Sequence, residues 1–411
     1  MGSELRAGRK LLRRRAMRRM VSAVGAGSPE GWAGLEMLEQ RLLLATWYVS
    51  DVTDPAEDGS ADHPFDSIQE GIDVAVGGDT IEVADGTYTE DLLIGKGVTV
   101  RSASGAANTT IQLVDGVGID ITLGGAQLGA SGQGFTVLSD AANTTAAVRL
   151  ADGVIGTSII GNIIDTSGAA TQGVSALAAV DMTVEANEFR FDTGDVAVTF
   201  NPRSTDTSVF NLDITDNAFT VTGGESSNAV ELGNFSNATI SGNTLEAPIV
   251  LYVGGGGFGS DGLTITQNTF TPMGDTSNGN GILLGREDAA ATGQLSNLSV
   301  IQNDFTDRWR AVEFYADAGN PAGSLMDSSI DEATLEITDN ILDTLVPAVM
   351  VFDPLTFVVD ASGNWWGSAT PADVAAQAGD RVDYTPWLAS GVDSDAELCQ
   401  ISVFASALLP T

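Results

Sequence analysis

Apolar and polar positions alternate along most of the chain, and one eight-residue pattern returns many times. The pattern is apolar, polar, apolar, two mostly polar residues, asparagine, any residue and apolar, as at 182–189 and 212–219. Its asparagines are Asn162, Asn187, Asn217, Asn243, Asn268, Asn303 and Asn340. They are separated by 25, 30, 26, 25, 35 and 37 residues. Self-similarity of this kind predicts a repeat protein in which each period is one structural unit.

The spacing of apolar residues within each repeat indicates strands. A helical repeat would place apolar residues 3.6 positions apart, whereas these segments have a period of two. Each repeat contains two or three short alternating runs separated by Gly, Asn, Asp or Ser, as at 229–232, 238–245 and 249–253. Short strands at a regular spacing, with turn residues between them, are typical of one coil of a parallel β-helix.

The recurring asparagine has a physical reason in such a fold. A tight corner needs a residue with left-handed backbone conformation, which asparagine tolerates well, so we expect the asparagines themselves to adopt it. Coils stacked about 4.8 Å apart would let their side-chain amides form a hydrogen-bonded ladder. The apolar residue two positions later would point inward and stack. The longer intervals predict insertions near 274–280 and 317–328, on one face where ligands usually bind.

The two ends of the repeat region have sequences of their own. Ile68, Ile72 and Ala75 are spaced as in a helix, which Asp66 or Ser67 can cap. The segment 63–88, HPFDSIQEGIDVAVGGDTIEVADGTY, resembles the N-terminal cap and first coil of pectin-lyase-like β-helix proteins. Residues 363–367 (GNWWG) and 382–388 (VDYTPWL) are similar to the terminal element of many bacterial right-handed β-helix proteins.

The resemblance spans residues 47–395 and implies an all-β fold: a single-stranded right-handed parallel β-helix, or solenoid, with a short N-terminal capping helix. We expect five regions. They are a basic targeting or export segment at 1–45, disordered or helical, a cap at 46–78, coils at 79–360, an aromatic cap at 361–395 and a tail at 396–411. Trp365, Trp366 and Trp387 could stack on sugars, but their place at the end of the coils favours a plug for the core.

Charge is distributed unevenly along the chain. Nine of the 18 basic and four of the 55 acidic residues lie in the first 45 positions, which leaves a net charge of −42 on the rest. A chain segment with this negative charge repels nucleic acid and anionic lipid. Divalent cations, or neutral and cationic polymers, are suitable partners. The acidity would also keep a long β surface soluble without any partner.

The N-terminal segment and the cysteine content bear on location. The segment 38–44, LEQRLLL, resembles the LEPRxLL-type segment of planctomycete surface and secreted proteins, with Gln40 in the place of the usual proline. An ordinary amphipathic helix is the alternative. Cys399 is the single cysteine, so no intramolecular disulfide can form. No run of about 20 apolar residues predicts a transmembrane helix.

One cluster combines acidic, basic and aromatic side chains. It follows the Asn303 corner and contains Asp307, Arg308, Trp309, Arg310, Glu313 and Tyr315. The candidates for catalytic residues of a surface groove are Asp307, Arg308, Arg310 and Glu313, and those for binding residues are Trp309 and Tyr315. An exposed turn with paired charges is the simpler interpretation. The aspartate motifs of polygalacturonase-type hydrolases are absent, and the single histidine, His63, precedes the first coil.

The sequence therefore predicts a monomeric β-helix protein that is secreted or exposed on a bacterial cell surface. We expect it to bind glycans, or to be adhesive or structural, with no recognisable catalytic site. The alternative is a lyase or glycoside hydrolase that acts on polysaccharides with help from Ca²⁺, which is the one cofactor considered.

Overall fold

The structure of the chain is a computed structural model. It describes residues 44–390 except 115–117, 140–145, 169–171, 193, 201–208, 224–226, 254–258, 273–278, 287–292 and 317–323. Nearly all of the N-terminal segment 1–45, most of the two expected insertions, Cys399 and the tail at 396–411 lie outside the described residues.

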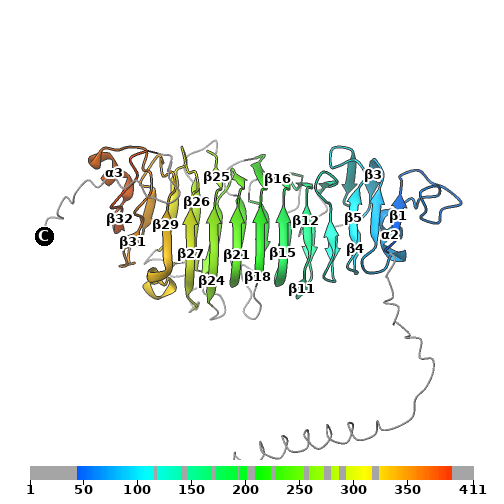
Figure 1. Cartoon of the computed structure of the whole chain (residues 1–411), viewed down its shortest axis with the longest axis horizontal. Helices are drawn as coiled ribbons and strands as arrows, with labels where there is room; N and C mark the ends of the chain where they lie inside the picture. The colour runs from blue at the N-terminus through cyan, green and yellow to red at the C-terminus, as the bar shows by residue number, and fades with distance from the viewer. Residues whose placement is uncertain are drawn as a thin grey trace, which may run out of the picture. The chain divides into compact units, whose positions relative to one another are not determined.

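Three parallel sheets stack their strands along one axis (Figure 1). Sheet A consists of β1 (Thr46–Val49), β2 (Thr80–Val83), β5 (Thr99–Ser102), β8 (Gln127–Leu128), β12 (Ser158–Ile160), β15 (Ala179–Glu185), β18 (Val209–Thr215), β21 (Phe235–Ser241), β24 (Ser260–Thr266), β27 (Leu295–Ile301) and β29 (Leu335–Thr338), with β11 (Val154–Ile155) beside β15. Sheet B consists of β3 (Gly86–Thr89), β6 (Thr109–Gln112), β9 (Thr136–Leu138), β13 (Ile163–Asp165), β16 (Glu188–Phe191), β19 (Ala218–Val221), β22 (Thr244–Leu245) and β25 (Thr269–Phe270). Sheet C consists of β4 (Leu92–Ile94), β7 (Ile119–Ile121), β10 (Val148–Leu150), β14 (Gln172–Ala176), β17 (Val196–Phe200), β20 (Asn228–Gly233), β23 (Ile249–Val253), β26 (Asn280–Arg286), β28 (Arg310–Phe314) and β30 (Val349–Val351).

Each coil supplies one strand to each sheet in turn, as β15, β16 and β17 do before β18 returns to sheet A. The register follows the alternation of the sequence: Met182 lies opposite Leu212, and Val184 opposite Ile214. All four of these side chains are buried. The expected right-handed parallel β-helix is therefore confirmed, and its core is the interior that the three sheets enclose.

The asparagines form one continuous column between sheets A and B. The side-chain amide of Asn217 donates to Oδ1 of Asn243 at 3.0 Å, and that of Asn243 donates to Asn268 at 2.9 Å. The same bond joins every neighbouring pair from Asn162 to Asn340. The column continues to Asn364, to which Asn340 donates at 2.9 Å. Asn364 belongs to the sequence that we assigned to the aromatic cap.

The left-handed residue at this corner is not the asparagine, which corrects our expectation. It is the residue before it, as in Asp216 with a φ of 56° and Gln267 with a φ of 56°. The same position holds Gly161, Ala186, Gly242, Gln302, Asp339 and Gly363. Because the preceding residue makes the turn, the asparagine is free to point inward and bond to the coils on either side.

The apolar residue two positions after each asparagine lies in the core, as expected. The rings of Phe189 and Phe219 stack with centroids 5.0 Å apart, and those of Phe270 and Phe305 with centroids 4.5 Å apart. Leu245 lies between Phe219 and Phe270 in the register of sheet B. This column gives the interior beside sheet B a continuous apolar filling.

A helix closes the core at the N-terminal end. The helix α2 (Ile68–Val74) begins after Ser67, whose side chain accepts a hydrogen bond from the Glu70 N–H at 3.2 Å. Ile68 and Ile72 are fully buried against the first coil. The carboxylate of Glu90 accepts hydrogen bonds from the Ile68 and Gln69 N–H groups. Burial nevertheless raises the pKa of Glu90.

A second helix, which we did not predict, closes the other end. The helix α3 (Pro371–Ala378) begins at a proline and buries Val374 and Ala378. It precedes β32 (Val382–Asp383), which pairs with β31 (Val359–Asp360). Trp366 is 1% exposed and lies in the core, while Trp365 and Trp387 are half-buried. The remaining helical turns of the described chain are η2 (Asp327–Ser329) and η3 (Glu332–Thr334). Among the described residues, no helix is both long and apolar enough to cross a membrane.

Candidate functional site

The cluster predicted at 307–315 spans the turn after the Asn303 corner and the strand β28 of sheet C. Asp307 makes this turn, with a φ of 60°, and its side chain is exposed. Trp309 is half-buried, and its backbone N–H donates to the Gly279 carbonyl at 3.1 Å. Neither side chain points to a shared centre with Arg308, because that arginine turns into the core.

The expectation that Arg308 lines a surface groove is wrong. Its side chain is fully buried, and its guanidinium donates to the carbonyls of Glu246 at 3.0 Å, Thr271 at 2.7 Å and Asn280 at 2.7 Å. Burial lowers the pKa of Arg308 to about 10. Glu246 lies in one coil, and Thr271 and Asn280 lie in the next, so Arg308 holds neighbouring coils together and does not reach the surface.

Arg310 and Glu313 do form a charged pair on the outer side of sheet C. The Arg310 guanidinium hydrogen-bonds the Glu313 carboxylate, and the two side chains are only 12% and 11% exposed. Arg310 also donates to the Pro347 carbonyl at 3.1 Å, and Asn280 donates to Glu313 at 3.3 Å. Both charges are thus neutralised by partners within the protein, which leaves neither side chain as a free acid or base.

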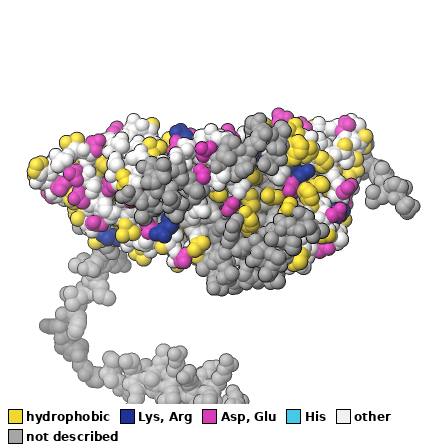
Figure 2. Space-filling view, turned by 180° about the vertical axis from the view of Figure 1, so that it is seen from behind, with side chains coloured by type: hydrophobic (Ala, Val, Ile, Leu, Met, Phe, Trp, Pro, Cys, Tyr) yellow, Lys and Arg dark blue, Asp and Glu magenta, His cyan; other side chains and the backbone are white. Residues whose placement is uncertain are grey.

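Arg310 lies close to a hollow at the C-terminal end of sheet C. Its guanidinium carbon lies 5.9 Å from the ring centroid of Phe352, and this ring lies 6.1 Å from that of Tyr315, at 52° to it. Both aromatic side chains line a hollow of about 450 Å³. Seen from behind, the molecule gathers hydrophobic side chains in its C-terminal half, with a few charged side chains among them (Figure 2).

Charged groups from the C-terminal cap complete this hollow. Arg381 has a φ of 61° and donates to the Asp353 carboxylate at 2.6 Å and to the Leu355 carbonyl. Asp380 and Met350 line the same space. The hollow therefore combines two aromatic faces with carboxylates and a guanidinium, which are the groups that bind sugar rings and hydroxyls.

The repeat spacing contains a signal for this hollow. The interval from Asn303 to Asn340 is 37 residues, and the same interval separates Tyr315 from Phe352. In the structure, Phe314 pairs with Val351, which places those two aromatic residues on neighbouring coils. Asp380 and Arg381 follow α3, outside the repeat, so the spacing could not have predicted them.

A second hollow, of about 340 Å³, lies toward the N-terminal end of sheet C. Arg149 lines it and donates to both carboxylate oxygens of Asp120, at 3.2 Å and 2.6 Å. Its other lining residues include Asp152, Ser175 and the half-exposed Leu177. It lacks aromatic side chains, which makes it a weaker candidate for a sugar site than the hollow at Tyr315.

Among the described residues, a group of carboxylates with the spacing of cation ligands lies at the N-terminal cap. Oxygens of Glu57, Asp66 and Glu70 lie within 4.8 Å of one another at the N-terminal cap. This group is far from the Tyr315 hollow along the chain of coils, and an exposed acidic group of this kind is not by itself a calcium site. The use of Ca²⁺ stays a prediction.

Comparisons with known proteins return similar solved structures only. No protein-family model matches the chain. A search of curated proteins likewise finds no match. Among solved structures, the catalytic domain of a GH87 alpha-1,3-glucanase in complex with tetrasaccharides is 14% identical over 83% of this chain and 71% of that one, with a TM-score of 0.39.

Two further solved structures resemble this chain at a similarly low sequence identity and TM-score. A pectin methylesterase in complex with a hexasaccharide is 13% identical over 80% of this chain and 96% of that one, with a TM-score of 0.33. An alginate lyase from Paenibacillus is 14% identical over 67% of this chain and 92% of that one, with a TM-score of 0.31. At these values the similarities carry no argument about activity, and the fold rests on the strand pairing of this chain.

Proposed function

We propose that this protein is an exported or cell-surface β-helix that binds glycans through the hollow between Tyr315 and Phe352. The observation that carries the proposal is the pair of aromatic rings, contributed by adjacent coils and placed 6.1 Å apart on the wall of a 450 Å³ hollow. Aromatic faces beside polar groups bind carbohydrate rings because apolar C–H faces and hydroxyls are recognised together.

The charge of the chain favours neutral or cationic glycans over polyuronates. The whole sequence has a net charge of −37, and Asp353 and Asp380 lie directly at the hollow. An anionic polymer would approach against this field unless cations bridged the two. Hydroxyl groups of a neutral glycan can instead donate to the carboxylates and accept from Arg381.

The alternative of a lyase or hydrolase lacks a free basic group among the arginines of the predicted cluster. Arg308 is fully buried, and Arg310 is paired with Glu313. A base must reach the proton that it removes, and neither arginine is placed to do so. We therefore propose binding without turnover at this site.

Affinity measurements by calorimetry on a panel of neutral, cationic and uronic-acid oligosaccharides test the proposal. We expect Phe352→Ala and Tyr315→Ala each to weaken binding of the preferred glycan roughly tenfold, because one stacked aromatic contributes about 1.4 kcal/mol. Phe210→Ala is the matched control, since Phe210 is 44% exposed on β18 of sheet A.

Two results would count against this function. Equal losses of affinity in all three variants would show that the effect is not local to the hollow. Release of unsaturated products or new reducing ends from polyuronates with Ca²⁺, abolished by Phe352→Ala, would replace binding by the enzymatic alternative.

A further inference from the structure

The main chain of the aromatic wall at the Tyr315 hollow is held by neighbouring coils. The Tyr315 N–H donates to the Leu284 carbonyl at 2.9 Å, and the Phe352 N–H donates to the Phe314 carbonyl at 3.2 Å. The side chain of Phe352 is only half-buried. Backbone bonds do not restrict rotation about its side-chain torsions, so a further contact is needed to keep the ring in one orientation.

Arg310 makes such a contact with the ring. Its guanidinium carbon lies 5.9 Å from the centroid of the Phe352 ring, which is within the range of a cation–π interaction. The Phe352 ring also lies 6.1 Å from the Tyr315 ring. Arg310 is not among the residues that line the hollow. It can therefore act on the ring without taking up space that a ligand would need.

The guanidinium of Arg310 is itself held by several partners. Its Nε donates to the Pro347 carbonyl at 3.1 Å, and another of its nitrogens hydrogen-bonds the Glu313 carboxylate. Glu313 also accepts from the side-chain amide of Asn280 at 3.3 Å. The main-chain carbonyl of Asn280 in turn accepts from the buried Arg308 at 2.7 Å. Groups from neighbouring coils thus fix the direction in which Arg310 points.

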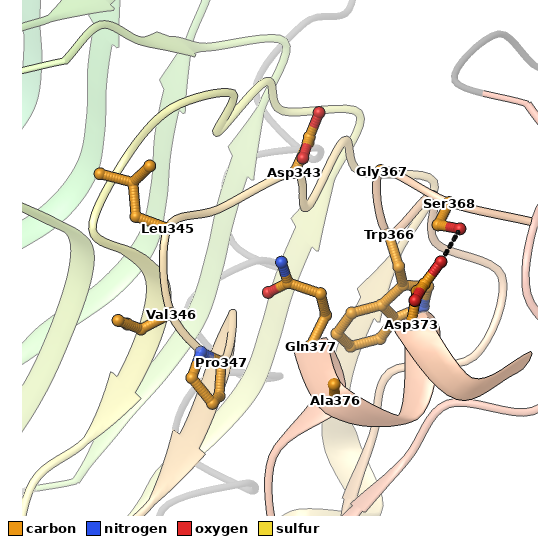
Figure 3. Close-up of a pocket in the computed structure, with 10 residues that line it drawn as sticks. All are labelled: Asp343, Leu345, Val346, Pro347, Trp366, Gly367, Ser368, Asp373, Ala376 and Gln377. Atoms are coloured by element: carbon orange, nitrogen blue, oxygen red, sulfur yellow. Dashed lines mark hydrogen bonds between the residues drawn. The ribbon is translucent and has the colours of Figure 1, made fainter. Parts of the chain in front are cut away.

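The Pro347 carbonyl is an acceptor with a fixed position. The segment before β30 is bonded on two sides, because the Leu345 N–H donates to the Arg308 carbonyl at 2.9 Å and the Ala348 N–H donates to the Gln377 carbonyl of α3 at 2.7 Å. Figure 3 shows Pro347 in this segment, which lines a hollow of about 390 Å³ together with α3. Arg310 therefore contacts Phe352 from a base that the last coil and α3 both hold.

We propose that Arg310 is a positioning residue of the glycan site, which keeps the Phe352 ring in one orientation on the wall of the hollow. The inference rests on the proposed function and deepens it, because it gives a residue outside the hollow control over the affinity inside it. Arg310 is paired with Glu313, so the two charges cancel and their effect on a neutral glycan is one of ring orientation.

The first test follows the ring itself and needs no glycan. In NMR spectra of the chain isotope-labelled on its phenylalanine rings, the signals of Phe352 are those that Phe352→Ala lacks. We expect Arg310→Met to shift or broaden these signals, and Arg310→Lys, which keeps a cation of similar reach, to restore them toward the wild type. Arg149→Met is the matched control, because Arg149 is paired with Asp120 on the same sheet, outside the hollow.

The second test is a double-mutant cycle on binding, measured by calorimetry with cellotetraose, laminaritetraose and mannotetraose as probes. We expect Arg310→Met to weaken binding of the tightest of these probes about fivefold, as the loss of a cation–π contact implies. Arg310→Met combined with Glu313→Gln should weaken it equally, because the loss comes from the ring and not from an unpaired carboxylate. Added to Phe352→Ala, Arg310→Met should have almost no further effect.

The outcomes separate this inference from the proposed function. Unmoved Phe352 signals, unchanged affinity in Arg310→Met, or additive losses when it is combined with Phe352→Ala would overturn the positioning role and leave glycan binding in place. If Phe352→Ala binds the probes as tightly as the wild type, the proposed function itself fails. Thermal unfolding shows whether each variant folds. If Arg310→Met does not fold, its combination with Glu313→Gln, which leaves no unpaired carboxylate, takes its place in both tests.

Discussion

At the scale of single residues, the asparagine column satisfies buried polar groups in several coils at once. The Asn243 amide donates to Asn268 at 2.9 Å, to the Ile214 carbonyl at 2.9 Å and to the Ser241 carbonyl at 3.0 Å. Its Oδ1 accepts from the backbone N–H and the side-chain amide of Asn217. One side chain therefore joins three consecutive corners of the helix.

Replacing this side chain should destabilise the fold strongly. We expect Asn243→Ala to lower the free energy of unfolding by about 3 kcal/mol, because it leaves buried N–H and carbonyl groups without partners. Urea denaturation followed by circular dichroism measures the loss. Asn108→Ala, at an exposed position, should change the stability by less than about 0.5 kcal/mol. Similar losses in both variants would contradict the role of the column.

His63 allows a test of local electrostatics, because it is the single histidine of the chain. Its Nδ1 lies 2.7 Å from the Asp54 carboxylate, and this hydrogen bond raises the pKa of His63 above its ordinary value of 6.5. The bond therefore favours folding below that value and loses its effect as the pH rises through the folded pKa. An NMR titration should show the raised pKa, and Asp54→Asn should return it toward 6.5. An unchanged titration midpoint in that variant would exclude the pair.

At the scale of elements, the coils could be predicted from the sequence because each repeats the same local pattern. Asn217, Asn243 and Asn268 stand in equivalent positions, so the alternation around one predicts the register of the next. The helix α3 could not be found in this way, because it occurs once and has only Val374 and Ala378 as buried positions.

Arg308 was misassigned because residue type shows a charge but not the direction of a side chain. The hollow at Tyr315 is completed by Asp380 and Arg381, which follow α3 outside the repeat, so the repeat spacing cannot predict them.

The caps should behave as separate units of stability. Val374 is fully buried between α3 and the last coils. We expect Val374→Asn to increase hydrogen exchange in β29 and β30 by at least tenfold while β15 and β18 stay protected, since solenoids open from their ends. Ala375→Asn is the control, because Ala375 is exposed on the same helix. Equal loss of protection along all coils would contradict the capping role.

At the scale of the whole molecule, acidic residues outnumber basic ones by 55 to 18. The resulting net charge of −37 makes the folded chain repel itself. Raising the salt concentration from about 0.01 M to about 0.15 M shortens the screening length from about 30 Å to about 8 Å. The melting temperature should therefore rise by a few degrees in NaCl, as differential scanning calorimetry can measure. The same rise in MgCl₂ and CaCl₂ at matched ionic strength would assign the effect to screening. A larger rise in CaCl₂ alone, removed by a chelator, would instead require a specific calcium site, because simple screening does not distinguish two cations of the same charge.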